Sequence, residues 1–327
     1  MSDKLQVSLS PHIRDKASTQ KIMLTVILAL LPAVVCGVLF YGFYVLLVIG
    51  VCIATCVLSE FLYQKLTKRT VTVKDLSAVV TGLLIGLNMP PGINPIFPIV
   101  GSAFAIIIVK QLFGGIGQNF MNPALGARCF MLISFSARMT DFTPKGGFIT
   151  LYQVDALSSA TPLSVLKEGV SPELTNLFLG NIHGTIGETS ALALLVGGII
   201  LLATKVIDFR IPLSYIGTFF CLVLVTALFR GYDAPLYFTL CEVCAGGLML
   251  GAWFMATDYA TSPITPWGKV IFGVLLGLLT FIFRMVSKSD EGVSYAIILG
   301  NCMVPMIEYF TKPHAFGVPK KKKEAKE

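Results

Sequence analysis

The sequence predicts an all-α polytopic membrane protein with about ten transmembrane helices, arranged as two inverted five-helix repeats in which some helices are short or broken. Only 13% of its 327 residues are charged, against roughly 25% in an average soluble domain. Hydrophobic residues make up 55% of the chain, and the mean hydropathy is +0.79. A soluble globule of this size could not cover its surface with so few charges. We therefore expect the chain to lie in a lipid bilayer, and its net charge of +7 does not indicate nucleic-acid binding.

Ten apolar stretches, bounded by charges, prolines or turn residues, support this fold class, because a helix that crosses the hydrocarbon needs about 20 mostly apolar residues. The predicted spans are 22–39, 43–63, 76–87, 96–112, 123–135, 189–206, 211–229, 236–255, 267–285 and 293–310. Two of them, 76–87 and 123–135, are short.

The Lys and Arg residues indicate the orientation of these spans. With an even number of spans both termini lie on one side, and that side collects eighteen of these cations, whereas the opposite side has six and Arg128 lies within a span. Because cytoplasmic loops carry the excess of Lys and Arg, we predict cytoplasmic termini in the plasma (inner) membrane and an extracytoplasmic loop. The predicted parts are a cytoplasmic N-terminal segment (1–20), a first repeat (21–136), the outward loop (137–188), a second repeat (189–310) and a basic cytoplasmic tail (311–327).

A short self-similarity suggests the repeat. The pattern Gly-Leu-x-x-Gly occurs at 82–86 in the third span and at 247–251 in the eighth, and a proline-containing break follows each. Repeats with an odd number of spans must have opposite orientations, and transporters with inverted repeats place their sites near interrupted helices. The segments 88–95 and 258–263 are the predicted breaks; the alternative is that they are ordinary turns between helices.

The outward loop contains the segment Asp155-Ala156-Leu157-Ser158-Ser159-Ala160-Thr161-Pro162. By local chemistry alone, Thr161 could be the N-cap of a helix over 162–167, because proline fits the first helical position. The same segment resembles Asp-x-x-Ser-x-Ala-Thr, the pattern at which a flavin transferase attaches FMN to threonine through a phosphoester. If both interpretations hold, the phosphate should lie near the amides of residues 163 to 165, since helix starts favour anions.

Together with the ten-span layout and the proline-rich third span, this motif makes nearly the whole chain similar to the NqrB/RnfD family. That family comprises the D subunit of the Rnf ion-translocating electron-transport complex and the B subunit of the sodium-pumping NADH:quinone reductase. The resemblance implies an electron-transport subunit, not catalytic alone, of a complex that couples electron transfer between ferredoxin and NAD to Na⁺ or H⁺ translocation. Its alternatives are a homologue of the quinone-reductase subunit and an inverted-repeat solute transporter or channel without a redox role.

The resemblance also implies cofactors, site residues and partners. Thr161 would carry the covalent FMN, and the acceptor residues around it would be Asp155, Ser158, Ser159 and Ala160. A second, non-covalent flavin (riboflavin) would lie within the bundle at a place that the sequence does not indicate. The partners would be the Rnf subunits A, B, C, E and G, the flavin transferase and the lipid bilayer.

Few other ionisable residues fall within the predicted spans. Arg128 would bind a flavin phosphate, pair with an acid or extend to the cytoplasmic rim, because a charge inside a membrane needs a partner or water. Glu242 and Asp258 are candidates for an ion path, and Asp258 could also be a loop residue at a helix end. Glu60 is expected at the membrane interface.

The cysteines predict no metal site. The spacing Cys241-x-x-Cys244 has no second pair of thiols to match it, whereas iron–sulfur clusters generally take four thiolates. Buried thiols on apolar helix faces are the ordinary interpretation.

Overall fold

The computed structural model describes residues 18–143, 161–167, 169–286 and 292–313. Within these ranges the chain forms helices and no strand. The first half contains α1 (Thr19–Tyr41), α2 (Tyr44–Leu66), η1 (Val73–Asp75), α3 (Ser77–Leu87), α4 (Ile96–Phe104) with its π-helical continuation η2 (Ala105–Gln111), α5 (Pro123–Ser134) and α6 (Ser136–Met139). The second half contains α7 (Pro162–Lys167), α8 (Leu174–Leu179), η3 (Ile186–Glu188), α9 (Ala191–Ala203), α10 (Arg210–Arg230), α11 (Pro235–Cys244), α12 (Leu248–Leu250) with its π-helical continuation η4 (Gly251–Met255), α13 (Pro266–Met285) and α14 (Val293–Thr311).

Each of the ten predicted spans contains a helix, and the all-α polytopic fold class is confirmed. Five helices in the described part of the chain are long and apolar enough to cross a membrane, namely α1, α2, α10, α13 and α14. A sixth candidate is the bent pair made by α11 and the helix Leu248–Met255. Four further apolar helices are shorter: Ser77–Leu87, Ile96–Gln111, Pro123–Ser134 and Ala191–Ala203.

Two details of the predicted spans were wrong. The sixth span is shorter than predicted, because its helix covers 191–203 rather than 189–206, whereas the helix over 96–111 agrees with the predicted 96–112 to within one residue. The eighth span is interrupted inside the predicted range, at residues 245–247, where the axis bends by 62°. Hydropathy did not reveal this interruption, because Ala245, Gly246 and Gly247 are as compatible with an apolar window as with a break.

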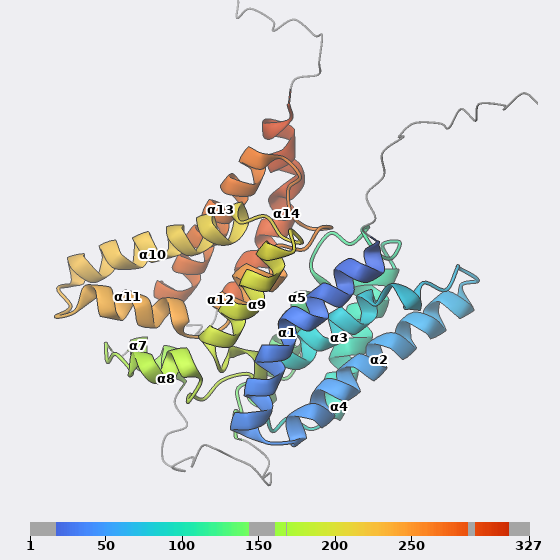
Figure 1. Cartoon of the computed structure of the whole chain (residues 1–327), viewed down its shortest axis with the longest axis horizontal. Helices are drawn as coiled ribbons and strands as arrows, with labels where there is room; N and C mark the ends of the chain where they lie inside the picture. The colour runs from blue at the N-terminus through green and yellow to red at the C-terminus, as the bar shows by residue number, and fades with distance from the viewer. Residues whose placement is uncertain (1–17, 144–160, 168, 287–291, 314–327) are drawn as a thin grey trace, which may run out of the picture.

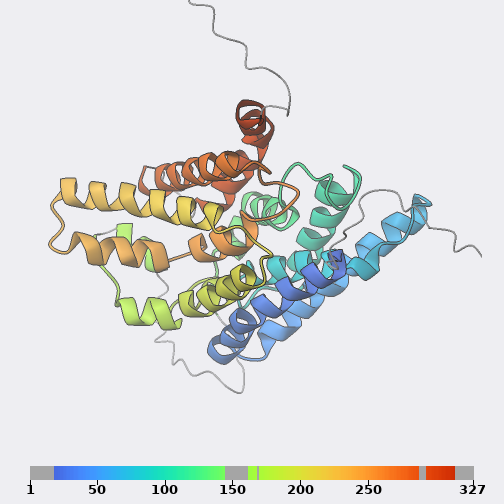
Figure 2. The same ribbon diagram turned by 45° about the horizontal axis from the view of Figure 1, so that its top comes forward.

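The two halves lie side by side, and α1 and α9 meet at the junction (Figures 1 and 2). Within the first half α2 packs on α3 and α4, and within the second half α10 packs on α11 and α13. Between the halves α1 contacts α9, and α5 contacts α14. These are the first and fifth helices of each half, which two-fold related repeats would bring together; the inverted orientation itself stays a prediction.

The two Gly-Leu-x-x-Gly elements pack differently, although both allow close approach. In α3, an added Cβ at Gly82 would lie 2.6 Å from the Ile53 Cα of α2, and one at Gly86 would lie 3.0 Å from the Ile49 Cα. At Gly251 the nearest atom would be the Val293 Cγ1 of α14, at 2.5 Å. Small residues permit tight helix packing in membranes, so the shared pattern reflects a packing need that each half meets with a different partner.

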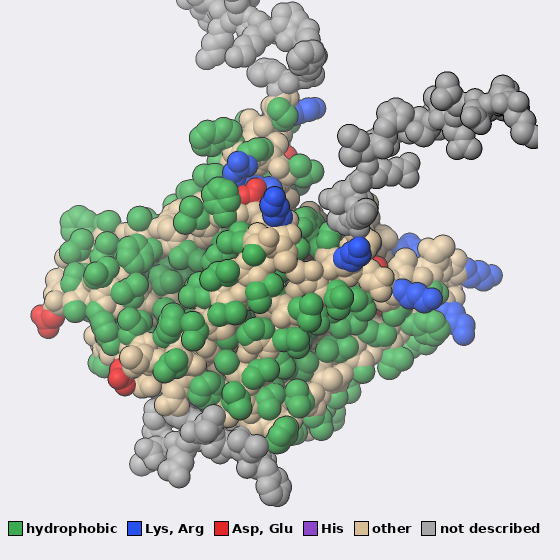
Figure 3. Space-filling model, viewed as in Figure 1, with side chains coloured by type: hydrophobic (Ala, Val, Ile, Leu, Met, Phe, Trp, Pro, Cys, Tyr) green, Lys and Arg blue, Asp and Glu red, His purple; other side chains and the backbone are tan. Residues whose placement is uncertain are grey.

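The start of the non-helical segment after α3 is buried in protein. Asn88 and Met89 are fully buried, and the Ile186 amide of the η3 segment donates to the Met89 carbonyl at 3.0 Å. Such backbone is tolerated at membrane depth only where protein or a cavity surrounds it. On the face shown in Figure 3, hydrophobic side chains cover the broad surface, Lys and Arg gather at the top and at the right, and Asp and Glu appear at the left, at the lower left and beside the cations near the top.

Candidate functional site

Thr161 is the N-cap of α7, as the Thr-Pro pair predicted. Its half-buried side chain accepts a hydrogen bond from the Ser164 amide, with Oγ1 and N 3.3 Å apart. The Ser164 hydroxyl donates to the Thr161 carbonyl at 2.7 Å. The other predicted acceptor residues, Asp155, Ser158, Ser159 and Ala160, lie outside the described residues.

The helix that Thr161 begins is anchored by two leucines. Leu163 is 7% exposed and Leu166 is completely buried, and α7 packs against α11. Burying two leucines contributes roughly 1.5–3 kcal/mol each. A helix of only six residues is marginal in isolation, so its position depends on this anchoring to the bundle.

Arg128 of α5 lies at the break after α3. Its guanidinium donates to Glu188 of η3 at 2.9 Å, and the two side chains are 4% and 8% exposed. A second nitrogen donates to the side-chain oxygen of Asn88. Of the three interpretations of Arg128, the ion pair with an acid is present in the structure, and the role in binding a flavin phosphate stays a prediction.

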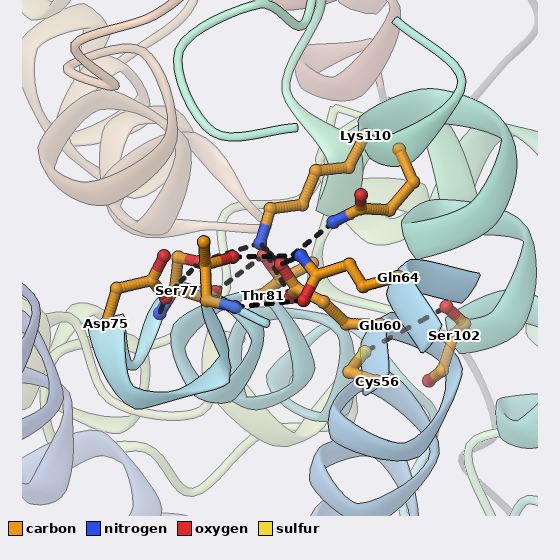
Figure 4. Close-up of polar contacts among 10 residues, drawn as sticks. Cys56, Glu60, Gln64, Asp75, Ser77, Thr81, Ser102 and Lys110 are labelled. Atoms are coloured by element: carbon orange, nitrogen blue, oxygen red, sulfur yellow. Dashed lines mark hydrogen bonds and ion pairs between the residues drawn. The ribbon is translucent and has the colours of Figure 1, made fainter. Parts of the chain in front are cut away.

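A second polar cluster joins α2, α3 and η2 (Figure 4). The Lys110 ammonium donates to Glu60 Oε2 at 2.8 Å and to Ser77 Oγ at 2.7 Å. The Gln111 amide donates to Glu60 Oε1 at 2.9 Å, and the Gln64 amide donates to the same oxygen at 3.3 Å. Lys110 and Gln111 end a π-helical segment, and π-helical turns occur frequently at functional sites.

Glu60 was expected at the membrane interface, and Lys110 was one of the eighteen cations assigned to the cytoplasmic side. Their side chains are 1% and 3% exposed inside the protein, and their depth in the membrane stays a prediction. The sequence did contain a signal for the burial of Lys110, because Lys110 lies in an apolar span that contains no other charged residue.

A third buried ion pair joins α13 to α11. Arg284 donates to the Glu242 carboxylate at 3.4 Å and to the Glu242 carbonyl at 2.7 Å. Its other terminal nitrogen donates to the Ala245 carbonyl at 2.9 Å. The guanidinium carbon lies 5.2 Å from the centre of the Phe219 ring. Arg284 was one of the six cations assigned to the outward side; its side chain is 3% exposed within the bundle, and its side of the membrane stays a prediction.

A cavity of about 360 Å³ lies between α1, α3, η2, the start of α5 and the turn after η4. Its walls are mostly apolar, and Lys110, Asn119, Asn122 and Asp258 line it as well. The Asp258 carboxylate accepts a hydrogen bond from the Thr261 hydroxyl at 3.2 Å. Lys110 therefore joins the cluster of Figure 4 to the cavity, and the structure brings Asp258, but not Glu242 or Arg128, to its wall.

Cys241, the first residue of the Cys-x-x-Cys spacing, is buried, and its sulfur lies 3.4 Å from the Pro172 carbonyl oxygen. Among the described residues no group of three or more His, Cys, Asp or Glu side chains could hold a metal ion.

Comparison with known proteins adds sequence relationships to this geometry. A model of the NQR2, RnfD, RnfE family matches residues 6–317. The chain is 46% identical to the D subunit of the Na⁺-translocating ferredoxin:NAD⁺ oxidoreductase complex of Acetobacterium woodii, over 98% of both chains. It is 39% identical to the D subunit of the proton-translocating ferredoxin:NAD⁺ oxidoreductase complex of Clostridium ljungdahlii, over 95% of this chain and 96% of that one. It is 35% identical to the D subunit of the ion-translocating oxidoreductase complex of Shewanella amazonensis, over 95% of this chain and 98% of that one.

Proposed function

The chain belongs to the NQR2, RnfD, RnfE family, and from this membership we propose that it is the D subunit of an Rnf-type complex. The complex would couple electron transfer between ferredoxin and NAD to the movement of Na⁺ or H⁺ across the membrane. The family membership leaves the homologous quinone-reductase subunit as the second candidate, and the relatives that are D subunits of ferredoxin:NAD⁺ oxidoreductase complexes favour the first. The observation that carries the proposal is the near full-length identity of 46% to a protein of that class.

We propose that Thr161 carries a covalent FMN. Its hydroxyl lies at the start of α7, where a phosphoester oxygen would stay beside the Ser164 amide and hydroxyl. The anchored leucines of α7 would hold that threonine against the bundle. A bound FMN would supply one-electron and two-electron redox chemistry, and this chain would supply the attachment oxygen and the position of the ring system.

The test is in-gel ultraviolet fluorescence of the protein produced in cells with an active flavin transferase. Thr161→Ala should remove the fluorescent band without reducing the amount of protein. Thr143→Ala is a matched control, because Thr143 also precedes a proline, is exposed and lies in the same predicted outward loop without the acceptor pattern. A fluorescent band that persists in Thr161→Ala would refute the attachment site.

We further propose that the 360 Å³ cavity holds the second, non-covalent flavin. Its size lies within the range of about 300–1,000 Å³ that is typical of ligand sites. Apolar walls suit a planar ring system, and the polar groups of Lys110, Asn119, Asn122 and Asp258 could orient its edge. Leu84→Trp should fill the cavity. The amount of riboflavin released on denaturation should then fall, while the fluorescent band of the covalent FMN in the same sample persists. An unchanged amount of released riboflavin would contradict this location.

Of the two acids predicted for an ion path, we propose Asp258. Asp258 lines the cavity, whereas the Glu242 carboxylate is paired with Arg284, an arginine that cannot release its proton. In membrane vesicles, Asp258→Asn should lower ion uptake more than it lowers electron transfer. The related chains are named for different coupling ions, so the Na⁺ dependence of electron transfer identifies the ion used here.

The remaining expectations follow from the same proposal. The protein would assemble with Rnf subunits A, B, C, E and G in the plasma membrane, after modification by the flavin transferase. Both termini would be cytoplasmic, and residues 137–188 would be extracytoplasmic. Cysteine-accessibility labelling at Thr143 and Lys68, which the structure places on exposed segments, should give opposite sides.

A further inference from the structure

The break between α11 and α12 lies directly beside the helix that begins with Thr161. The helical axis bends by 62° across this break, and Gly246 has φ +66°, a left-handed conformation that favours glycine. Neither the family membership nor the proposed flavin sites require a break at this point.

Arg284 holds the end of α11 at the break. The last carbonyls of a helix have no partner within the helix. Arg284 donates to one of them, at Glu242, and to the carbonyl of Ala245, the residue that follows the helix. The guanidinium also faces the negative end of the helix dipole and contacts the Glu242 carboxylate. Arg284 therefore acts as a buried cap that keeps α11 ended at this residue.

The missing side chain of Gly246 makes room for α7. An added Cβ at this position would lie 2.6 Å from Leu163 Cδ1 and 3.0 Å from Arg284 Nη2. The first distance is shorter than real Cβ contacts, so a side chain here would push Leu163 Cδ1 from its place. Leu163 is the second residue of the helix that Thr161 caps, so a change in how Leu163 packs acts on the helix that carries the Thr161 oxygen.

The segment after α7 is also attached to α11. The Tyr237 hydroxyl of α11 donates to the Pro172 carbonyl at 3.2 Å and accepts from the Leu174 amide at 2.9 Å. The segment between α7 and α8 is thus attached at Pro172 and Leu174 to α11, whose end Arg284 holds.

We propose that Arg284 and Gly246 form a seat for α7 that positions the flavin on Thr161 relative to the membrane bundle. This inference rests on the proposed attachment of FMN to Thr161. Arg284 and Gly246 are positioning residues: they act through Leu163 and do not touch the attachment oxygen. The attachment reaction, which depends on the acceptor sequence, should tolerate changes in the seat, whereas electron transfer through the attached flavin should not.

The test compares Gly246→Ala with Gly231→Ala in the assembled complex. Gly231 has φ +70°, so both variants place alanine in a left-handed conformation, but no atom lies within 4 Å of the Cβ added at Gly231. Both variants should retain the fluorescent band. In Gly246→Ala alone, the fluorescence anisotropy of the covalent flavin should fall, and ferredoxin-to-NAD electron transfer should drop by about tenfold or more, since small misplacements of reacting groups have effects of this order.

Leu163→Ala changes the α7 side of the same contact, and it provides the test if the Gly246→Ala variant does not assemble. It should lower the anisotropy with the band intact, and the double variant should be no worse than the stronger single variant, because both changes act on the same packing of Leu163 against Gly246. Unchanged anisotropy and electron transfer in Gly246→Ala and Leu163→Ala, with the band intact, would overturn the inference. A wild-type protein without the fluorescent band would instead overturn the proposed attachment, on which the inference rests.

Discussion

The Glu60–Lys110 pair provides a quantitative prediction, because the same type of pair occurs elsewhere in the chain with different burial. Lys110 lies 2.8 Å from the Glu60 carboxylate, and the side chains are 3% and 1% exposed. Lys269 lies 3.0 Å from the Asp208 carboxylate, and these side chains are 23% and 25% exposed. Because the nitrogen–oxygen distances in the two pairs are nearly equal, a comparison of the pairs tests the effect of burial.

Lys110→Met would leave the Glu60 carboxylate buried without its ammonium partner. Breaking a buried pair in this way costs about 3–5 kcal/mol, whereas an exposed pair contributes about 0.2–1 kcal/mol. Because the Gln64 and Gln111 amides would still donate to Glu60, we expect a loss near the lower value, about 3 kcal/mol. Lys269→Met should lose less than about 1 kcal/mol.

The assay is denaturant titration of the purified protein in mixed micelles, followed by the fluorescence of its two tryptophans. Adding Glu60→Gln to Lys110→Met should recover part of the stability, because it removes the unpaired charge. The Lys269→Met variant is the matched control. Equal losses for the two lysine variants would refute the conclusion that burial, rather than distance, determines the energy of the pair.

Other predictions concern pH and packing. His183 lies in the segment between α8 and η3, and burial lowers the pKa of its imidazole. The unfolded state therefore binds a proton more readily than the folded state. The stability of the protein should fall as the pH drops below about 6.5, the ordinary pKa of histidine. His183→Gln should reduce this decline in melting temperature between about pH 7.5 and 5.5, and an unchanged slope would exclude His183 as its source. An added Cβ at Gly197 would lie 2.2 Å from the Ala29 carbonyl oxygen and 2.7 Å from Phe254 Cζ, so Gly197→Ala should separate α1 from α9 and destabilise the protein by about 1–3 kcal/mol. Gly217→Ala, with no atom within 4 Å of the added Cβ, should have no such cost, and equal effects of the two alanines on the denaturation midpoint would contradict the packing argument.

The spans could be predicted because each depends on local composition. The run 211–229 is apolar enough for hydropathy alone to predict a span. The observed helix, Arg210–Arg230, extends one residue beyond the predicted span at each end. The Thr161–Pro162 pair likewise predicted the start of α7, because N-cap chemistry involves only the next three residues. Local chemistry also explains why Thr265 begins α13, where its side chain accepts from the Gly268 amide.

The partners of the buried charges could not be predicted in this way. Glu188 lies 60 residues from Arg128 along the chain, and Glu242 lies 42 residues from Arg284. A hydropathy window contains neither partner, so Arg284 was counted only by its side of the membrane and Glu188 was not considered. Contacts of this kind form only when helices from different parts of the chain pack together.

The amino-acid sequence alone was sufficient for the membrane class, the number of apolar helices and the threonine at the start of α7, because hydrophobicity and capping act over short distances. The tertiary structure was needed to place Lys110 on Glu60, to bring Asp258 to the cavity wall and to seat Leu163 on Gly246. The physical reason is desolvation: a charged group buried in protein requires a partner, and only the packing of distant helices brings that partner within reach.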